Sequence, residues 1–504
     1  MNTSANEELE PVQTGQAAPA AQRWWERWTP LAAAALAVFY LVTSILIAGH
    51  RLLWFDEIVT VLISRLPGAS RIVDALAHVD NNMPAPYFLV VHGFFKLLGE
   101  GAVAARLPSA LAMAAGLLIT FDCTRRLTDG LHGLIAICVL GCSCLPYYGY
   151  EARSYGLYVM LSAFCFWIWV HGRRSNFSAL LFGAAFFLSI MFHYYAVLGL
   201  VPYAAWEALS WIRWRMPSAK LIAGGLALCC AAAVLIPQMS GAKRYSAVFW
   251  SAPSMLKLRT TFSDLIPDGL FLLALILIWV VLTARARGMS GTIGMESAES
   301  IGWLGFLIPF AGYVLARVVT NAYVSRYFLG LLPGVAVAFS CWTWRHFRET
   351  PLVPAGILLI LAGFAMETQL STMRHPESID PFGQQTATRR ALQMESTLRA
   401  EGKHFTLLTN GLLYLELRYY AKHPEEYALL VPSAEHLETH NTARYIAGLG
   451  KYYPMQFWTL EDLRKHAAET ALLEPTEDSW KMLKEAGLEA RRRFVAPTEV
   501  DYLQ

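Results

Sequence analysis

Long apolar runs separated by short polar turns occupy residues 30–369 of the chain. The first run extends from Pro30 to about Ala48, and a helix needs about 20 apolar residues to cross a hydrocarbon core. We expect the other spans near residues 103–121, 131–147, 155–170, 178–192, 196–212, 219–237, 269–283, 301–317, 327–343 and 352–369. This pattern predicts a polytopic α-helical membrane protein with about eleven spans.

The composition supports this class. Hydrophobic residues make up 55% of the chain and charged residues only 16%, whereas an average soluble domain carries about 25% charged residues. The net charge of +3 is small for 504 residues, and proteins that bind nucleic acid concentrate positive charge on a surface. The sequence therefore predicts a lipid bilayer, and no nucleic acid, among the partners.

One apolar segment, Pro86–Leu98, is too short to be a span. As a helix it would rise about 20 Å, whereas the hydrocarbon core is roughly 30 Å thick. We expect a helix lying in the membrane interface, within a first outer loop at residues 50–102. The next span then ends at Arg125 and Arg126, which this topology assigns to the cytoplasm.

Basic residues orient the spans. Residues 1–29 have no apolar periodicity and carry arginines just before the first span, which predicts a disordered cytoplasmic tail. Turns on the same side also carry Arg173, Arg174, Arg213, Arg215, Lys220, Arg285, Arg287, Arg345 and Arg348. This positive-inside pattern predicts a cytoplasmic N-terminus and places Asp56 on the outer side.

An odd number of spans places residues 370–504 outside the membrane. Strand-like and helix-like segments alternate in this region, which is typical of a small α/β domain. The strand-like segments are His404–Thr409, Tyr427–Val431, Met455–Thr459 and Arg492–Val495, and the helix-like segments include Thr386–Ala400 and Ser479–Ala486. Residues 30–369 would then form the transmembrane catalytic domain.

Carboxylates, arginines and aromatic residues gather in the turns that face outward. Asp56 and Glu57 directly follow the first span, and ionisable groups at a membrane surface are costly unless they bind or react. Such a mixture of charges and aromatic rings suits an anionic substrate that carries hydroxyl groups. Other outward turns hold Tyr150, Glu151, Arg153, Tyr155, His193, Tyr194, Lys243, Arg244, Arg326 and Tyr327.

Transfer of a sugar from a lipid phosphate to a hydroxyl needs a base and cations. The base takes the proton of the acceptor, and the cations hold the charge of the departing phosphate. We expect Asp56 to be the base, with Glu57 assisting it or orienting the acceptor. Arginine matches phosphate oxygens in a bidentate manner, so Arg153 and Arg326 are phosphate candidates. Lys243 or Arg244 could join them, while the tyrosines and His193 would contact the sugar.

Structural roles compete with each of these assignments. The acidic pair Asp56–Glu57 could cap an interfacial helix, because acids favour helix N-termini. Glu151 and Arg153 could form a structural ion pair, and Arg326–Tyr327 could anchor a span at the interface. His193, in a tyrosine-rich turn, could be a buried structural histidine.

Several motifs in this order resemble the bacterial branch of the GT-C glycosyltransferases. These are relatives of the dolichyl-phosphate-mannose protein mannosyltransferases and of the aminoarabinose transferases of lipid A, in glycosyltransferase family 39. The resemblance covers about residues 30–340. It rests on Asp56-Glu57, Met83-Pro84-Ala85-Pro86-Tyr87-Phe88, Ala105-Arg106-Leu107-Pro108-Ser109-Ala110-Leu111, Tyr150-Glu151-Ala152-Arg153-Ser154-Tyr155, His193-Tyr194-Tyr195-Ala196 and Ser325-Arg326-Tyr327 with Leu332-Pro333.

The resemblance implies an inverting hexosyl- or pentosyltransferase of the bacterial inner membrane. Its donor would be a polyprenyl-phosphate sugar, its acceptor an envelope lipid, glycan or protein, and its site periplasmic. Asp56 would be catalytic, and Mg²⁺ or Mn²⁺ could bind there, because family members with and without a metal requirement exist. One departure is that Met83-Pro84-Ala85-Pro86 stands where relatives usually have a basic residue before Pro-Pro-Leu.

Two other classes of protein fit part of the pattern. A transporter or flippase would also have many spans, but carriers usually place ionisable residues near mid-membrane and show internal repeats. Here the charges lie at the outer ends of the spans, which favours the enzyme. A catalytically inactive membrane scaffold, whose C-terminal domain binds envelope partners, is the second alternative.

Overall fold

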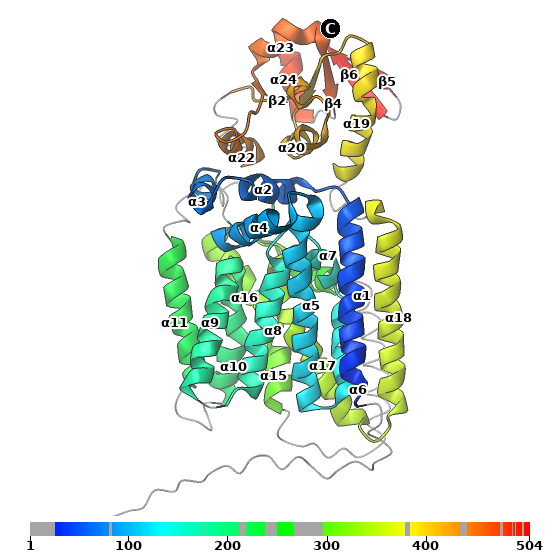
Figure 1. Cartoon of the computed structure of the whole chain (residues 1–504). Helices are drawn as coiled ribbons and strands as arrows, with labels where there is room; N and C mark the ends of the chain where they lie inside the picture. The colour runs from blue at the N-terminus through cyan, green and yellow to red at the C-terminus, as the bar shows by residue number, and fades with distance from the viewer. Residues whose placement is uncertain are drawn as a thin grey trace, which may run out of the picture.

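The computed structural model describes residues 26–79, 83–173, 175–210, 218–236, 249–266, 296–378, 384–433, 441–473, 477–485, 487–488, 490–495 and 498–503. These residues form three layers (Figure 1). A bundle of apolar helices comes first, short helices lie across one end of it, and a domain with a β-sheet lies beyond them.

Apolar helices make up the bundle, and they confirm the predicted polytopic architecture. Within the described residues, five helices are long and apolar enough to cross a membrane, and five more apolar helices are shorter. The bundle contains α1 (Thr29–His50), α5 (Ala102–Leu127), α6 (Gly130–Gly141), α8 (Tyr155–His171), α9 (Asn176–Phe192), α10 (Val201–Ser210), α11 (Ala219–Leu235), α15 (Glu296–Leu304), α16 (Leu307–Leu315), α17 (Leu332–Phe347) and α18 (Leu352–Arg374). The predicted span at residues 269–283 lies outside the described residues.

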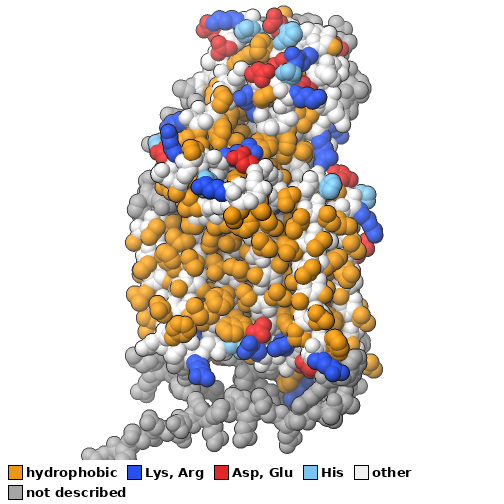
Figure 2. Space-filling model, in the orientation of Figure 1, with side chains coloured by type: hydrophobic (Ala, Val, Ile, Leu, Met, Phe, Trp, Pro, Cys, Tyr) orange, Lys and Arg blue, Asp and Glu red, His pale blue; other side chains and the backbone are white. Residues whose placement is uncertain are grey.

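Short elements connect these helices. They are α7 (Leu145–Gly149), η2 (Tyr194–Leu200), α13 (Met255–Leu265), η5 (Ala316–Thr320) and η6 (Ser325–Leu331). Hydrophobic side chains cover the visible side of the bundle, and charged side chains collect at its two ends (Figure 2). This distribution is what a bilayer requires, because a charge in the hydrocarbon core is costly.

Small residues let α5 and α8 approach closely. A Cβ added to Gly156 would collide with the backbone carbonyl of Ser109, and the N–H of Gly156 donates to the Ser109 hydroxyl at 3.1 Å. A Cβ at Gly116 would lie 3.3 Å from the Cα of Met160. Glycine at such crossings permits the backbone contact that packs membrane helices. This packing brings the residues at the start of α8 next to the start of α5.

Three short helices form the layer across the end of the bundle. They are α2 (Phe55–Ser64), α3 (Ala69–His78) and α4 (Ala85–Leu98). Figure 1 shows α2 and α4 lying across the bundle axis, as the short length of Pro86–Leu98 predicted. Pro84 has an extended backbone directly before α4, and Pro86 lies in the first turn of α4, where a proline supplies a fixed φ and needs no N–H partner.

The C-terminal domain contains a six-stranded sheet in the order β3-β2-β1-β4-β6-β5. The pairs β1–β2, β1–β4 and β2–β3 are parallel, whereas β4–β6 and β5–β6 are antiparallel. The strands are β1 (Phe405–Leu408), β2 (Tyr427–Leu430), β3 (Phe457–Trp458), β4 (Thr470–Leu473), β5 (Ala490–Val495) and β6 (Thr498–Leu503). The helices are α19 (Gln384–Ala400), α20 (Gly411–Tyr420), α22 (Asn441–Leu449), α23 (Leu460–His466) and α24 (Glu477–Glu485).

A continuous apolar cluster joins this domain to the layer of short helices. It includes Ile58 and Leu62 of α2, Val91 of α4, and Leu413 and Leu417 of α20, each at most 8% exposed. Polar contacts reinforce it: the hydroxyl of Tyr453 donates to the carbonyl of Leu62 at 2.6 Å. The C-terminal domain is therefore packed onto α2.

Candidate active site

Asp56 lies in the first turn of α2, where two arginines from other elements reach it. Arg153, in the turn between α7 and α8, donates from Nη1 to Oδ2 of Asp56. Nη2 of Arg326, at the start of η6, lies 3.9 Å from the same oxygen. The Asp56 side chain is 28% exposed, whereas the arginines are 10% and 12% exposed. The site is therefore an accessible carboxylate backed by two nearly buried cations.

Aromatic rings hold both arginines in place. The guanidinium carbon of Arg153 lies 6.0 Å from the ring centre of Trp54, and that of Arg326 lies 5.9 Å from the same ring. Nη2 of Arg153 also donates to the hydroxyl of Tyr155 at 3.4 Å. The guanidinium carbon of Arg326 also lies 6.0 Å from the ring centre of the exposed Trp250. Cation–π contacts at this range restrict the guanidinium groups while leaving their N–H donors for other partners.

Glu57 has entirely different surroundings from Asp56. Its side chain is buried, and Nε and Nη2 of Arg106 donate to its two oxygens at 2.7 Å and 2.5 Å. The N–H of Ala152 donates to Oε1 at 2.8 Å, and the N–H of Trp54 donates to Oε2 at 3.3 Å. Burial opposes the charge of Glu57, but Arg106, Arg51 and the N–H of Ala152 together lower the pKa of Glu57. This carboxylate links three segments of the chain.

Arg106 completes the linkage. Its Nη1 donates to the carbonyls of Ala48 and Arg51 at 2.8 Å and 2.9 Å, and its Nη2 donates to the carbonyl of Leu52 at 2.9 Å. These carbonyls lie at and just after the end of α1, where the helix leaves carbonyls without internal partners. Arg106 therefore ties α5 to the α1–α2 connection, directly before Asp56.

Glu151 is also buried, but it is loosely paired. Its Oε1 lies 3.8 Å from Nη2 of Arg51, and the two side chains are at most 1% exposed. Burial raises the pKa of Glu151 to about 7, although Arg51 acts against this shift. Nη2 of Arg51 also donates to the hydroxyl of Tyr147 at 3.2 Å. Glu151 lies two residues before Arg153, and its contact with Arg51 helps to hold the turn between α7 and α8.

His193 directly follows α9 and contacts Tyr155, the ring against which Arg153 packs. Its ring stacks on Tyr158 with centres 4.9 Å apart and contacts Tyr155 and Tyr327 at 5.6 Å and 5.5 Å. Burial, followed by the charges of Arg153 and Arg326, lowers the pKa of His193 to about 3. The imidazole is therefore neutral at physiological pH and does not act as a phosphate-binding cation.

The structure brings most of the predicted residues into one cluster. Asp56, Arg153, Tyr155, His193, Arg326 and Tyr327 form it, and Glu57 and Glu151 lie behind it. Tyr194 is partly buried and packs against the apolar core of the bundle. Lys243 and Arg244 lie outside the described residues. Met83 packs against the apolar cluster around α2 and α4.

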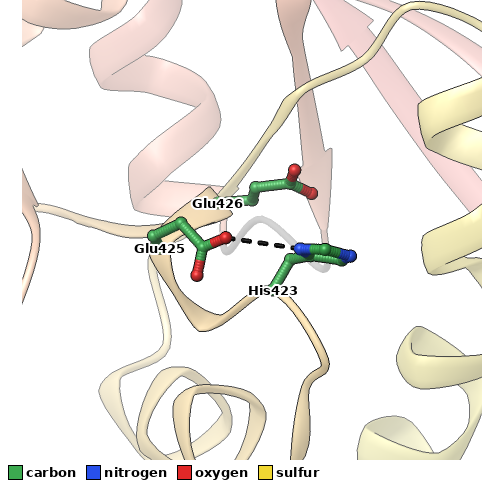
Figure 3. Close-up of side chains that lie close together, drawn as sticks. All are labelled: His423, Glu425 and Glu426. Carbon is green, nitrogen blue, oxygen red and sulfur yellow. Dashed lines mark hydrogen bonds and ion pairs between the residues drawn. The ribbon is translucent and has the colours of Figure 1, made fainter.

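The residues around Asp56 do not suit a metal ion. Mg²⁺ and Mn²⁺ take oxygen ligands, but the contacts described for Asp56 are guanidinium groups, and Arg106 occupies the oxygens of Glu57. Within the described residues, the group of three metal-type side chains is His423, Glu425 and Glu426 in the C-terminal domain (Figure 3). Nδ1 of His423 lies 3.3 Å from Glu425, and Glu426 pairs with Arg399 at 3.4 Å. These pairs are typical of an exposed charge network.

Sequence reasoning missed Arg106 and Arg51, the partners of the two buried glutamates. A signal for Arg106 was present, because it falls within the predicted span at residues 103–121, where a charge needs a partner. Arg51 directly follows α1 and looked like an ordinary interface residue. Trp54, which contacts both site arginines, resembled the many other interfacial aromatic residues of the chain.

Comparisons with known proteins agree with this architecture. The sequence model of the dolichyl-phosphate-mannose-protein mannosyltransferase family matches residues 82–236. ArnT from Cupriavidus metallidurans in the apo state aligns with a TM-score of 0.56 at 13% identity, over 96% of this chain and 98% of that one. The chain shares the fold of this ArnT. ArnT bound to undecaprenyl phosphate gives a TM-score of 0.54 at 13% identity, over 94% and 97% of the two chains.

The matches differ in what they cover. The family match includes Glu151, Arg153, Tyr155 and His193 but ends before Arg326 and begins after Asp56. The fold shared with ArnT extends over nearly the whole chain, covering 94% and 96% of it in the two structures. No curated protein sequence matches the chain.

Proposed function

We propose that this protein transfers a sugar from a polyprenyl-phosphate donor to an extracytoplasmic acceptor, with inversion at the sugar. The observation that carries the proposal is the accessible carboxylate of Asp56 beside Arg153 and Arg326, at one end of a GT-C bundle. This arrangement supplies a proton acceptor and an anion site within one cluster. The family match and the undecaprenyl phosphate named for the related ArnT structure support this class of donor.

Arg326 is suited to bind the donor phosphate. Its contact with Asp56 is long at 3.9 Å, and its Nε is a buried donor that lacks a hydrogen-bond partner among the described residues. A buried donor without a partner is costly, and a phosphate oxygen would remove that cost. Guanidinium groups also bind phosphate in a bidentate manner. As the sugar–phosphate bond breaks, this cation would stabilise the charge that collects on the phosphate.

Asp56 would accept the proton of the acceptor hydroxyl. Its exposure lets a hydroxyl reach it, whereas the nearby arginines favour its ionised form, which is the form a base needs. An inverting reaction requires attack from the face of the sugar opposite the phosphate. Asp56 would take the proton of the attacking acceptor oxygen, with Arg153 holding the carboxylate and Tyr155 holding Arg153.

Glu57 would support the site without taking part in the proton transfer. Arg106 and two backbone N–H groups already use its oxygens. His193, Tyr155 and Tyr327 would form the neutral aromatic floor beneath the sugar. Because His193 is neutral and buried, its contribution would be shape and a hydrogen bond from the ring.

The same proposal places the protein in a bacterial inner membrane with Asp56 and the C-terminal domain in the periplasm. Basic residues support this orientation: Arg125 and Arg126 lie at the far end of α5 from Arg106, and Arg345 and Arg348 lie at the far end of α17 from Arg326. Cytoplasmic turns are the ones enriched in arginine and lysine. The acceptor would be an envelope lipid, glycan or protein.

Transfer of labelled sugar tests the proposal. Membranes containing the wild type or Asp56→Asn would receive a panel of polyprenyl-phosphate sugars, with native envelope extract as the acceptor. We expect label to move from one donor with the wild type and not with Asp56→Asn at equal protein levels. Wild-type transfer by Asp56→Asn, or no transfer from any donor by folded wild type, would contradict the proposal and favour a carrier or a scaffold.

A further inference from the structure

The C-terminal domain supplies hydrogen-bond acceptors to the first residue of α2 and to the connection directly before it. The first N–H groups of a helix have no acceptors within the helix. The N–H of Phe55 donates to Oε1 of Glu416 at 3.2 Å, across 361 residues of sequence. The N–H of Leu53 donates to the hydroxyl of Tyr420 at 2.5 Å. Both acceptors are on α20, so the C-terminal domain caps the helix that carries Asp56.

Glu416 is itself held firmly. Its side chain is fully buried, and the hydroxyl of Thr388 on α19 donates to its Oε2 at 2.6 Å. A buried carboxylate is costly unless hydrogen bonds compensate for lost water. The two oxygens of Glu416 thus point to different partners, one in its own domain and one in α2. This carboxylate acts as a fixed connection between the domain and the first turn of α2.

Two glutamates together fix the backbone around Asp56. Glu57, held by Arg106 of the bundle, accepts from the N–H of Trp54. Glu416, held by the C-terminal domain, accepts from the N–H of Phe55, the residue before Asp56. A carboxylate at a helix N-terminus is also favoured by the helix dipole. The bundle and the C-terminal domain therefore share control of where the Asp56 carboxylate points.

We infer that Glu416 is a positioning residue for Asp56, and that the C-terminal domain is in this way a working part of the transferase site. The inference rests on the proposed function, because it assigns Asp56 the role of base. Glu416 does not touch the substrate in this account. It acts by keeping the first turn of α2 in the position that aligns Asp56 with Arg153 and Arg326.

The test compares kcat and the donor KM for full-length Glu416→Ala and Glu416→Gln with those of the wild type. Misplacing a catalytic group by about 1 Å can cost roughly 100-fold in rate, so we expect Glu416→Ala to lower kcat by about tenfold or more. The donor KM should stay within about twofold, because the arginines are untouched. Glu416→Gln should retain most of kcat, since its amide oxygen can still accept from Phe55 and its amide nitrogen can donate to Thr388.

Matched controls separate positioning from general damage. Glu395→Ala removes a carboxylate on α19 that also accepts a backbone N–H, that of His423 at 3.0 Å, but within the C-terminal domain. Its kcat should equal that of the wild type. Tyr420→Phe removes one hydroxyl from the same cap and should lower kcat by about threefold, since it leaves Glu416 in place. This milder variant provides the kcat comparison if Glu416→Ala folds poorly.

Three results would overturn the inference. The first is a wild-type kcat in folded Glu416→Ala or, if that variant cannot be purified, in Tyr420→Phe. The second is a loss of kcat in Glu395→Ala equal to that in Glu416→Ala. The third is a loss of kcat in Glu416→Gln as large as that in Glu416→Ala. Asp56→Asn in the same assay isolates the proposed function. If Asp56→Asn retained wild-type turnover, the base assignment would fail, and this inference would fail with it.

Discussion

Asp56 and Glu57 are neighbours in sequence, yet they belong to two different kinds of charge cluster. Glu57 is buried, and every contact described for it comes from a fixed donor of the protein. Asp56 is 28% exposed, and one of its two arginines stands 3.9 Å away. Protein donors already occupy the oxygens of Glu57, so this saturated cluster has no capacity left for a ligand. The open cluster around Asp56 does have that capacity. The contrast indicates that saturation, rather than charge alone, separates a supporting carboxylate from a reacting one.

The largest effect on stability should come from removing the cation that pairs with Glu57. Arg106→Ala leaves Glu57 buried without its cation, and breaking a buried ion pair costs about 3–5 kcal/mol. We expect a large fall in the thermal midpoint of the purified protein and in its folded yield. Arg126→Ala on the same helix is the control, because its pair with Asp122 is 53% and 31% exposed and should cost less than about 1 kcal/mol. Equal midpoints for the two variants would contradict a supporting role for Arg106.

The open cluster should respond in binding rather than in stability. Arg326→Ala removes the proposed phosphate ligand, and a hydrogen bond to a charged group contributes roughly 1.5–3 kcal/mol. We expect the donor KM to rise about 10- to 100-fold while the acceptor KM changes little. Arg317→Ala provides a control, since Arg317 is exposed and bonds to the hydroxyl of Tyr313 at 3.1 Å. Equal effects on donor and acceptor would remove the phosphate role from Arg326.

A smaller effect on stability should come from Glu151, which is buried like Glu57 but has a long ion-pair contact of 3.8 Å, to Arg51. Its pKa is raised from 4.5 to about 7 by burial, so the folded state binds more protons than the unfolded state between these values. Stability of the wild type therefore falls as pH rises from about 4.5 to about 7. Glu151→Gln should flatten that part of a plot of thermal midpoint against pH, whereas Glu461→Gln on the exposed face of α23 should not. A slope unchanged by Glu151→Gln would contradict the raised pKa.

Much of the architecture follows from local sequence patterns. Apolar run length predicted the bundle helices and the crosswise helix α4, and alternating segments predicted strands at β1, β2, β3 and β5. Strands β4 and β6 were missed. The residues of β4 are buried throughout, so a short apolar run carried no alternation to distinguish it from a loop or a helix end.

Part of the candidate site could likewise be predicted from the sequence, and part could not. The outward turns that hold Asp56, Arg153 and Arg326 could be found from topology, since spans of known direction bring their ends to one face. The different roles of Asp56 and Glu57 could not, because adjacent helical residues point about 100° apart and their partners lie elsewhere in the chain. Arg106 is 49 residues from Glu57, and Glu416 is 361 residues from Phe55. Only the packed structure shows such pairings.

The most direct test of the contrast measures turnover per folded molecule and thermal midpoint for Asp56→Asn and Glu57→Gln side by side. Both substitutions remove one charge and keep the size of the side chain. Loss of a general base lowers turnover by about 100- to 10,000-fold, so Asp56→Asn should lose turnover and keep a midpoint close to that of the wild type. Glu57→Gln should lower the midpoint and should lose far less turnover per folded molecule than Asp56→Asn, because Glu57 only positions the base. The reverse pattern, or the same loss in both variants, would contradict the account.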